Sequence, residues 1–404
     1  MAPRFPLRDV AEMRDRARQM LPRALFDYIC RGTEGETALE ALRQGFDRRR
    51  IVPRMASGAI APDSLRGRSP FAIAPTALAG LVVHDGEVRM ARAAARAGVP
   101  FCVATQSSTS IEDIARGAPG AELWFQLYVW RDRAETWQLL DRVRALGVTT
   151  LLVTADTPAS PKKVHNQRNG FGIPLRMSPR LAVDFARHPR WLLGVAGRYL
   201  LQGGLPSYAH YPGEARAAVT RAIRDPRFAL DPVVGPDLLA QLRDRWPGRL
   251  IVKGVLDAGD AARLMTLGCD GIVVSSHGGR NHDSAVTPLA MLPAIREAVG
   301  PAATVLADSG VMRGSDAAKL IGAGADGVLL GRAPLYGLAA AGEDGALAAI
   351  ACLEDELLAF LAFSGLADLA ALRVAHWMDD AQFFPMGYKL SYKKMKHNES
   401  AGWR

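Results

Sequence analysis

Eight short apolar runs recur along the chain, and most are followed by a longer stretch with helical spacing of apolar positions. Several runs are nearly continuous in apolar character, which is typical of parallel strands covered on both faces. The predicted strands are residues 71–74, 101–105, 123–129, 150–156, 250–255, 271–276, 304–309 and 327–332. The predicted helices between them include residues 87–97, 134–146, 258–267, 289–299 and 315–323. Eight β–α repeats favour an α/β fold, a closed (β/α)8 TIM barrel, over a doubly wound open sheet.

The strands divide the chain into four predicted parts. The barrel spans residues 70–373, and residues 1–69 form an N-terminal helical extension. The gap between the fourth and fifth strands is too long for a simple crossover, so residues 157–249 are a predicted insertion. It follows a strand on the face where barrel loops build active sites, which makes it a candidate lid. Residues 374–404 form a C-terminal tail rich in aromatic and basic residues: Trp377, Phe383, Phe384, Tyr388, Lys389, Lys393, Lys394 and Lys396.

Composition and charge narrow the function classes. The 404 residues hold 50 Lys and Arg against 41 Asp and Glu, a net charge of +9, which suits an anionic ligand, a nucleic acid or a membrane surface. The arginines are dispersed and no nucleic-acid-binding motif is present, so we expect no nucleic acid partner. The four cysteines are far apart, which argues against a disulfide framework or a cysteine zinc site, and we expect no metal.

The N-terminus lacks the apolar stretch of a secretory signal, and no apolar run reaches 18 residues. The expected compartment is therefore the cytoplasm.

Polar side chains gather where the predicted strands end, although the strands are apolar. The carboxyl ends of barrel strands meet on one face, and that face carries the active site of such enzymes. One polar residue in an apolar strand is often structural, but six strands ending this way indicate a functional face. These residues are Gln126, Tyr128, Thr154, Asp156, Lys253, Ser275, His277, Asp308, Ser309, Gly331 and Arg332.

The loops after the last two strands predict a phosphate site. Gly310, Gly314 and Gly331 allow close approach of the backbone, and Arg313 and Arg332 supply charge. Loops at this place in barrels commonly bind phosphate.

His277 follows the sixth strand and precedes two glycines, with Arg280 three residues further on. Asp156 ends the fourth strand and is placed to orient the imidazole and stabilise its charged form. Arg280 is suited to bind a carboxylate through two hydrogen bonds. A base, its acidic partner, a carboxylate ligand and a phosphate site together predict a 2-hydroxy or 2-oxo acid substrate and a phosphorylated cofactor.

At this point the sequence resembles a known family, the FMN-dependent 2-hydroxy acid dehydrogenases and oxidases, over residues 5–375. Its members include glycolate oxidase, lactate dehydrogenase and mandelate dehydrogenase, and the stretches HPRW and LWFQLYV look most like the mandelate and lactate dehydrogenase branch. The matching segments are LPRALFDYICRGTEGETAL, IAPTALAG, ATQSSTSIED, LWFQLYVWRDR, LLVTADTP, RNGFGIP, IVKGVLDAGDA, VVSSHGGRNHD, LADSGVMRGSD and GADGVLLGRAPLYGLAA.

The resemblance implies roles for residues that bind substrate. His277 matches the catalytic base and Asp156 its supporting carboxylate. Arg280 matches the main carboxylate ligand, while Tyr28 and Tyr128 match tyrosines that contact the carboxylate and the substrate oxygen. Lys253 matches a lysine beside flavin N1 and O2.

It also implies an FMN site. The backbone of Pro75, Thr76 and Ala77 matches the segment at flavin N5. Gln126, Thr154 and Ser275 match contacts to the ring or the ribityl chain. The ribityl and phosphate site is matched by Asp308, Ser309, Gly310, Gly331 and Arg332.

Several positions depart from the family pattern. The motif around the base usually reads SNHGGRQ, and here Ser276 and Asn281 differ. Lys163 stands where the family has a second active-site arginine, which keeps the charge but loses the bidentate geometry. Three further departures concern the flavin and the substrate side chain: Ala104 replaces a flavin-contacting serine, Gln106 replaces an aromatic pocket residue of some members, and Met312 replaces a phosphate-binding arginine beside Arg313.

The predicted reaction is FMN-dependent oxidation of an (S)-2-hydroxy acid, such as mandelate or lactate, to the 2-oxo acid. Electrons would pass to a quinone, oxygen or a protein carrier. Two alternatives remain, namely FMN-dependent oxidation of an amino or peptide-derived substrate and a redox-neutral isomerisation.

Residues 176–201 combine arginines with apolar side chains, which predicts a peripheral contact with the inner face of the cytoplasmic membrane or, alternatively, a lid or subunit contact. The family resemblance implies a homotetramer.

Overall fold

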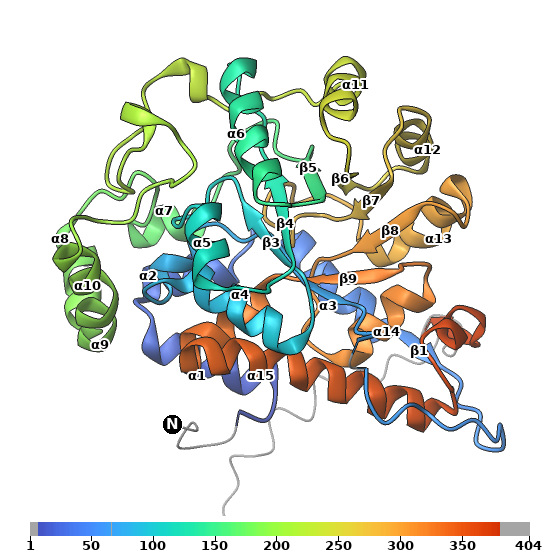
Figure 1. Ribbon diagram of the computed structural model, residues 1–404. Helices are drawn as coiled ribbons and strands as arrows, with labels where there is room; N and C mark the ends of the chain where they lie inside the picture. The colour runs from blue at the N-terminus through green and yellow to red at the C-terminus, as the bar shows by residue number, and fades with distance from the viewer. Residues whose placement is uncertain (1–6, 66, 380–404) are drawn as a thin grey trace, which may run out of the picture.

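The computed structural model describes residues 7–65 and 67–379, so the tail residues Phe383, Phe384, Tyr388, Lys389, Lys393, Lys394 and Lys396 lie outside the described residues. Eight parallel strands form a closed barrel, in which the last strand pairs with the first (Figure 1). The strands are β2 Phe71–Ile73, β3 Phe101–Ala104, β4 Leu123–Leu127, β5 Thr150–Thr154, β6 Arg249–Val255, β7 Gly271–Val274, β8 Thr304–Ala307 and β9 Gly327–Leu330. The TIM-barrel prediction is confirmed.

Helices follow the strands and surround the barrel (Figure 1). They are α4 Gly86–Ala97, α5 Ile111–Gly117, α6 Arg133–Ala145, α11 Pro236–Arg245, α12 Ala258–Thr266, α13 Pro288–Val299, α14 Gly314–Gly322 and α15 Arg332–Ser364, which bends at Ala341 and Gly342. Side-chain caps fix several N-termini: Ser110 accepts from the third residue of α5, and Asp132 accepts from two backbone N–H groups at the start of α6. The short helix η1, Ala79–Leu81, follows β2.

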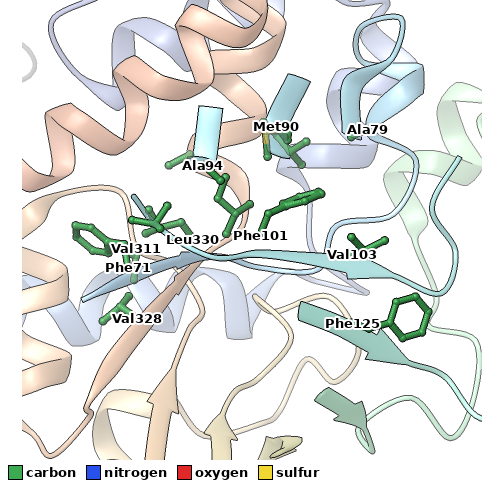
Figure 2. Packing of buried hydrophobic residues seen from close by; sticks show 14 of the residues in the cluster. Phe71, Ala79, Met90, Ala94, Phe101, Val103, Phe125, Val311, Val328 and Leu330 are labelled. Atoms are coloured by element: carbon green, nitrogen blue, oxygen red, sulfur yellow. The ribbon is translucent and has the colours of Figure 1, made fainter. Parts of the chain in front are cut away.

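Two apolar layers hold the barrel together. Side chains that point into the barrel form one layer: Ala72, Ala74, Cys102, Trp124, Leu152, Ile251, Val273, Leu306 and Leu329. Alternate residues such as Phe71, Phe101 and Phe125 point outward and join the larger core between strands and helices, where Met90 and Ala94 of α4 pack (Figure 2). The period of two along each strand therefore separates an inner from an outer core.

The N-terminal residues form α1 Val10–Met20, α2 Arg23–Cys30 and α3 Thr37–Arg48. Helix α1 packs along α15. A two-stranded antiparallel ribbon then pairs β1, Arg49–Ile51, with β10, Trp377–Asp379, which follows η5, Ala370–Val374. The ribbon joins the predicted extension to the start of the predicted tail, and the division of the chain at residues 69 and 373 stays a prediction.

The insertion between β5 and β6 is partly helical and lies at one side of the barrel (Figure 1, green). It contains α7 Val164–Asn169, α8 Pro179–Ala186, α9 Pro189–Trp191, η2 Leu192–Gly197, α10 Arg198–Leu201, η3 Gly213–Ala215 and η4 Pro226–Phe228 before α11. Asp184 of α8 accepts hydrogen bonds from the backbone N–H groups of Arg23 and Ala24, which start α2. The insertion is thus anchored to the helix that carries Tyr28. Within residues 7–65 and 67–379, no helix combines the length and the apolar character that a membrane crossing requires.

Candidate active site

A polar layer lies directly above the inner apolar layer of the barrel. Five inward-pointing apolar residues are followed two positions later by a polar residue, because inward-facing positions repeat with period two. Trp124 is followed by Gln126, Leu152 by Thr154 and Ile251 by Lys253. The same step leads from Val273 to Ser275 and from Leu306 to Asp308. The five strands end within two residues of this layer.

A cavity of about 510 Å³ opens above this layer, in the range typical of cofactor and substrate sites. Most of the residues predicted for the site line it: Tyr28, Pro75, Thr76, Ala77, Ala104, Gln106, Gln126, Tyr128, Thr154, Lys163, Lys253, His277, Arg280, Asp308, Ser309, Gly310, Met312, Gly331 and Arg332. Asp156 and Ser275 do not line the cavity themselves but contact residues that do, namely His277 and Lys253. Arg313 does not line the cavity: it precedes α14 and lies 3.7 Å from Asp47.

His277 and Asp156 form a hydrogen-bonded pair at the cavity. Nδ1 of His277 lies 2.9 Å from Oδ1 of Asp156. Burial alone would raise the pKa of Asp156, but the charges of His277 and Lys253 and hydrogen bonds from His277 and Thr157 outweigh it and lower the pKa to about 2. An ionised carboxylate only accepts hydrogen bonds, so Nδ1 carries the proton. When the ring carries a single proton, Nε2 is therefore the nitrogen that can accept another.

The loop of His277 is held in an uncommon backbone conformation. His277 has a φ of 53°, and its backbone N–H donates to the hydroxyl of Ser275. The hydroxyl of Ser309 accepts from the N–H groups of Ser276 and Gly278, so the β8 loop supports the β7 loop. A Cβ on Gly279 would lie 2.8 Å from the backbone nitrogen of Leu39, which excludes any side chain there.

Lys253 is a buried cation with acidic partners. Its Nζ donates to the Ser275 hydroxyl at 2.9 Å and lies 3.3 Å from Oδ2 of Asp308. Burial opposes the charge, but Asp308 and Asp156 raise the pKa of Lys253 above its usual value. Lys253 therefore stays protonated at the floor of the cavity.

Arg280 and Arg332 bind the carbonyl end of α2. Nη1 of Arg280 donates to the carbonyl of Tyr28 at 2.7 Å, and Nε of Arg332 donates to that of Ile29 at 3.0 Å. These carbonyls belong to the last turn of a helix, where partial negative charge attracts cations. Burial and the neighbouring Arg280 lower the pKa of Arg332, although a guanidinium stays charged in proteins. Neither arginine forms an ion pair with a carboxylate of the described residues, so both leave positive charge for an anionic ligand.

Lys163 adds a further cation from the loop after β5. Its Nζ lies 4.9 Å from the centre of the Tyr28 ring, and the guanidinium carbon of Arg280 lies 5.1 Å from the same centre. Both distances suit cation–π contacts. Tyr28 thus holds two cations at the cavity.

Two other predicted residues are fixed by neighbouring elements. The backbone N–H of Tyr128 donates to the Thr105 hydroxyl, and burial raises the pKa of the Tyr128 phenol, so this phenol is protonated. Gln126 donates from its amide to the Thr154 hydroxyl at 3.0 Å.

Sequence reasoning missed part of the cavity wall. The insertion contributes Thr157, Pro158, Ala159, Ser160, Pro161 and Leu230, and α2 contributes Leu25 and Ile29. Leu25 and Ile29 stand three residues before and one after Tyr28, so the helical period was a usable signal for Leu25. No sequence signal marks the α2 carbonyls as partners of Arg280 and Arg332. The departure Asn281 donates to the Asp156 carbonyl at 2.9 Å and so helps to hold the acid's loop.

The model of a known family, FMN-dependent dehydrogenase, matches residues 17–379. The chain belongs to this family. It is therefore an oxidoreductase, and its cofactor is FMN. This membership supports the oxidation that the sequence predicts rather than a redox-neutral isomerisation.

Relatives and solved structures of this family cover nearly the whole chain. L-lactate dehydrogenase of Caulobacter vibrioides is 37% identical over 89% of this chain and 95% of its own length. (S)-mandelate dehydrogenase of Pseudomonas putida is 35% identical over 90% of this chain and 92% of its own. The crystal structure of the monotopic membrane protein (S)-mandelate dehydrogenase aligns with a TM-score of 0.83 at 35% identity, covering 93% of this chain and all of the other.

The cavity of this FMN-dependent dehydrogenase fits a phosphorylated flavin. Two buried hydroxyls, those of Thr76 and Ser276, have no hydrogen-bond partner among the described residues, and Thr76 lines the cavity. Buried polar groups are normally satisfied, so these point to a ligand or to water. Arg332 offers unpaired positive charge for a phosphate, and Gly310, whose φ is 86°, lines the same cavity. Donors, charge and space agree with the cofactor that the family implies.

Proposed function

We propose that this enzyme oxidises an (S)-2-hydroxy acid to the 2-oxo acid, with His277 as the base. The observation that carries the proposal is the pairing of His277 Nδ1 with Asp156 at 2.9 Å, in a cavity that also holds Arg280 and Lys163. An imidazole oriented by a carboxylate, in a cavity that also holds two basic side chains, suits removal of a proton from a hydroxy acid. The lactate and mandelate dehydrogenases among the relatives support this substrate class.

The residues act on the substrate as follows. Arg280 and Lys163 bind its carboxylate, together with Tyr28, and this contact fixes which face of C2 is presented to the flavin. The protonated phenol of Tyr128 donates to the substrate oxygen. His277 accepts a proton from C2 or from the hydroxyl, and Asp156 stabilises the resulting imidazolium.

Bound FMN supplies the two-electron oxidant. Pro75, Thr76, Ala77 and Ala104 would hold it at the β2 and β3 ends, and Gln126, Thr154, Lys253 and Ser275 at the floor. Asp308, Ser309, Gly310, Gly331 and Arg332 would hold the ribityl chain and phosphate. Lys253, kept charged by Asp308, stabilises negative charge that develops on the ring system. Met312 lines the cavity without adding charge, and Arg313 lies outside its lining. We therefore propose that, among these residues, Arg332 is the one positively charged side chain that binds the phosphate.

A panel of hydroxy acids tests this function. Anaerobic mixing of the FMN-loaded protein with (S)-mandelate, (S)-lactate and longer (S)-2-hydroxy acids is expected to bleach the flavin absorbance with at least one of them. Replacing the base by His277→Ala is expected to slow bleaching by roughly 10²–10⁴-fold. If none of the acids bleaches the flavin, this substrate class is wrong, and an undiminished rate in the variant would remove His277 from the role of base.

We further propose that the insertion binds a membrane surface peripherally, on its cytoplasmic face, where a quinone would accept the electrons. Part of residues 176–201 packs inward, since Leu181, Phe185 and Trp191 are buried. Leu193, Leu200 and Leu201 remain 72%, 62% and 90% exposed, beside exposed arginines. Leucines flanked by arginines suit an interface with anionic lipid. The monotopic (S)-mandelate dehydrogenase supports this reading.

Flotation with anionic liposomes at low salt tests the membrane contact. A triple change of Leu193, Leu200 and Leu201 to Ser is expected to abolish binding. The matched control is Phe363→Ser, which removes an apolar side chain that is 82% exposed on α15, outside the insertion. Equal binding by the triple variant and the wild type would exclude this surface. Faster reoxidation of the reduced enzyme by a quinone than by oxygen would support a quinone as the electron acceptor.

The family resemblance also supports a homotetramer. Light scattering of the purified protein is expected to give four times the chain mass, and a monomer mass would overturn this assignment.

A further inference from the structure

Lys163 occupies an unusual position for a lysine, since it lines the cavity with no acid beside it. Its ammonium lies over the Tyr28 ring at 4.9 Å, and Arg280 lies over the same ring. The side chain of Lys163 lines the cavity and is half-buried, whereas that of the preceding Lys162 is exposed. Two cations therefore face one space, and nothing in the described part of the chain neutralises Lys163.

The acids of the surrounding elements are engaged elsewhere. On α2, Asp27 lies within ion-pair distance of Arg23 and Arg31 and accepts from Asn169. Before α3, Glu36 pairs with Arg31 and with His165 of α7.

On the barrel side, Asp156 pairs with His277, so the β5 and β7 loops also offer Lys163 no free carboxylate. The other titratable groups of the cavity lining are Tyr28, Tyr128, Lys253, Asp308 and Arg332, and Asp308 pairs with Lys253. Arg280 is therefore the charged group that acts on Lys163, and it acts against the ammonium.

Burial and the charge of Arg280 lower the pKa of Lys163 to about 7. The amine is thus divided between its charged and neutral forms at neutral pH when no anion is bound. An arginine at the same place, as the family resemblance implies for other members, would stay charged throughout.

We infer that Lys163 takes up a proton when a carboxylate enters the space that it shares with Arg280, so that substrate binding is coupled to protonation of this amine. The inference rests on the proposed function, because it takes the substrate to be a 2-hydroxy acid. An anion placed beside the amine favours the ammonium form, and proton uptake is the thermodynamic consequence.

Binding of a carboxylate is expected to weaken as the pH rises above the pKa of Lys163. Below about pH 7 the amine of the free enzyme is already charged, so binding of the carboxylate takes up only a small fraction of a proton. Above about pH 7 the free amine is mostly neutral, so the bound state gains up to one proton. Affinity then falls by up to about tenfold for each pH unit, until the pH reaches the higher pKa of the bound state.

Calorimetry of the FMN-loaded enzyme with phenylacetate tests the inference. Phenylacetate is a mandelate without the 2-hydroxyl, so it carries the carboxylate but does not react at a hydroxyl. Titrations in buffers of different ionisation enthalpy give the number of protons taken up. The expected values are about half a proton at pH 7 and close to one at pH 8, from the pKa of about 7.

Two arginine variants separate Lys163 from its neighbours. Lys163→Arg is expected to bind phenylacetate with no proton uptake and with an affinity that does not change between pH 7 and 8. Lys162→Arg changes the adjacent exposed lysine in the same way and is expected to behave as the wild type. Equal uptake in Lys163→Arg and wild type would assign the proton to another group, such as His277, and overturn the inference. The inference would also be overturned if the wild type took up no proton on binding phenylacetate, or if it did not bind phenylacetate.

Steady-state and anaerobic kinetics distinguish this failure from failure of the proposed function. In the wild type, KM for the (S)-2-hydroxy acid is expected to rise above pH 7, and in Lys163→Arg this rise is expected to disappear. Flavin bleaching by the hydroxy acid with no proton uptake contradicts the role of Lys163 alone. If no hydroxy acid bleaches the flavin, the proposed function itself fails.

Discussion

Two lysines in the same cavity have opposite environments. Lys253, at the floor, donates to Ser275 and lies 3.3 Å from Asp308, and its acidic neighbours raise its pKa although it is fully enclosed. Lys163, in the loop after β5, has Arg280 and an aromatic ring as neighbours, and its pKa falls to about 7. Burial acts in the same direction on both. The difference is the carboxylate within reach of one and absent from the other.

This difference separates a permanent charge from a conditional one. A lysine paired with an acid keeps its proton whatever binds, which suits a group that stabilises charge on a cofactor. A lysine without an acid depends on its ligand to stay charged, which suits a group that binds a carboxylate.

Removing the acid beside Lys253 is expected to have the largest effect. Asp308→Asn leaves the ammonium buried with only the more distant Asp156, and breaking a buried pair in this way costs about 3–5 kcal/mol. Urea denaturation at a fixed FMN concentration measures the loss. The control is Asp260→Asn, which breaks an exposed pair with Arg263 and should cost less than about 1 kcal/mol. Similar losses in the two variants would contradict the account.

Removing the permanent charge itself is expected to affect the chemical step. Lys253→Met should slow flavin reduction by roughly 10²–10³-fold, the effect of losing one preorganised group that stabilises developing charge. Stopped-flow absorbance under anaerobic conditions measures this rate. A change in KM with an unchanged limiting rate would instead place Lys253 in substrate binding.

Removing the conditional charge is expected to affect substrate binding. Lys163→Met deletes a charge-assisted contact to the carboxylate, worth about 1.5–3 kcal/mol, which corresponds to a rise in KM of about 10–150-fold. The limiting rate should change less than KM. A fall in the limiting rate at constant KM would remove Lys163 from carboxylate binding.

The smallest expected effect concerns acid stability. Asp156 supports Lys253 and His277 but not Lys163, and its pKa lies at about 2 instead of the ordinary 3.8. A carboxyl whose pKa is lowered on folding stabilises the protein above its unfolded pKa, and this part is lost as the pH falls from about 4 to about 2. The contribution is on the order of 2 kcal/mol. Asp156→Asn should flatten the fall in the free energy of unfolding between these pH values, as measured by urea denaturation. An unchanged pH profile would show that another group causes the fall.

The sequence predicted the barrel and much of its polar layer for a simple physical reason. Each strand continues its inward-facing period of two past the apolar core, so Gln126, Thr154 and Lys253 stand two positions after apolar residues of the inner layer. The acidic partner of Lys253 follows from the same pattern, because Asp308 stands two positions after Leu306 of the inner layer. Local periodicity was sufficient there.

Other features depend on contacts between segments that are distant in sequence. The cap that Asp184 provides to α2, and the α2 carbonyls that bind Arg280 and Arg332, join residues more than 150 positions apart. The isolation of Lys163 from acids is likewise a property of packing, because Asp27 and Glu36 are near in the fold but are paired with Arg31. The wall supplied by residues 157–161 depends on the path of the insertion. No local pattern encodes these arrangements.

The most direct test compares the two enantiomers of one hydroxy acid in a single turnover. In the proposed reaction, Arg280 and Lys163 bind the carboxylate, and the imidazole of His277 is held by Asp156. Only one configuration at C2 would then present its hydrogen correctly. We expect the (S)-enantiomer of mandelate or lactate to bleach the bound flavin under anaerobic conditions and the (R)-enantiomer to leave it oxidised. Equal bleaching by both enantiomers, or bleaching by the (R)-form alone, would contradict this arrangement of base and carboxylate site.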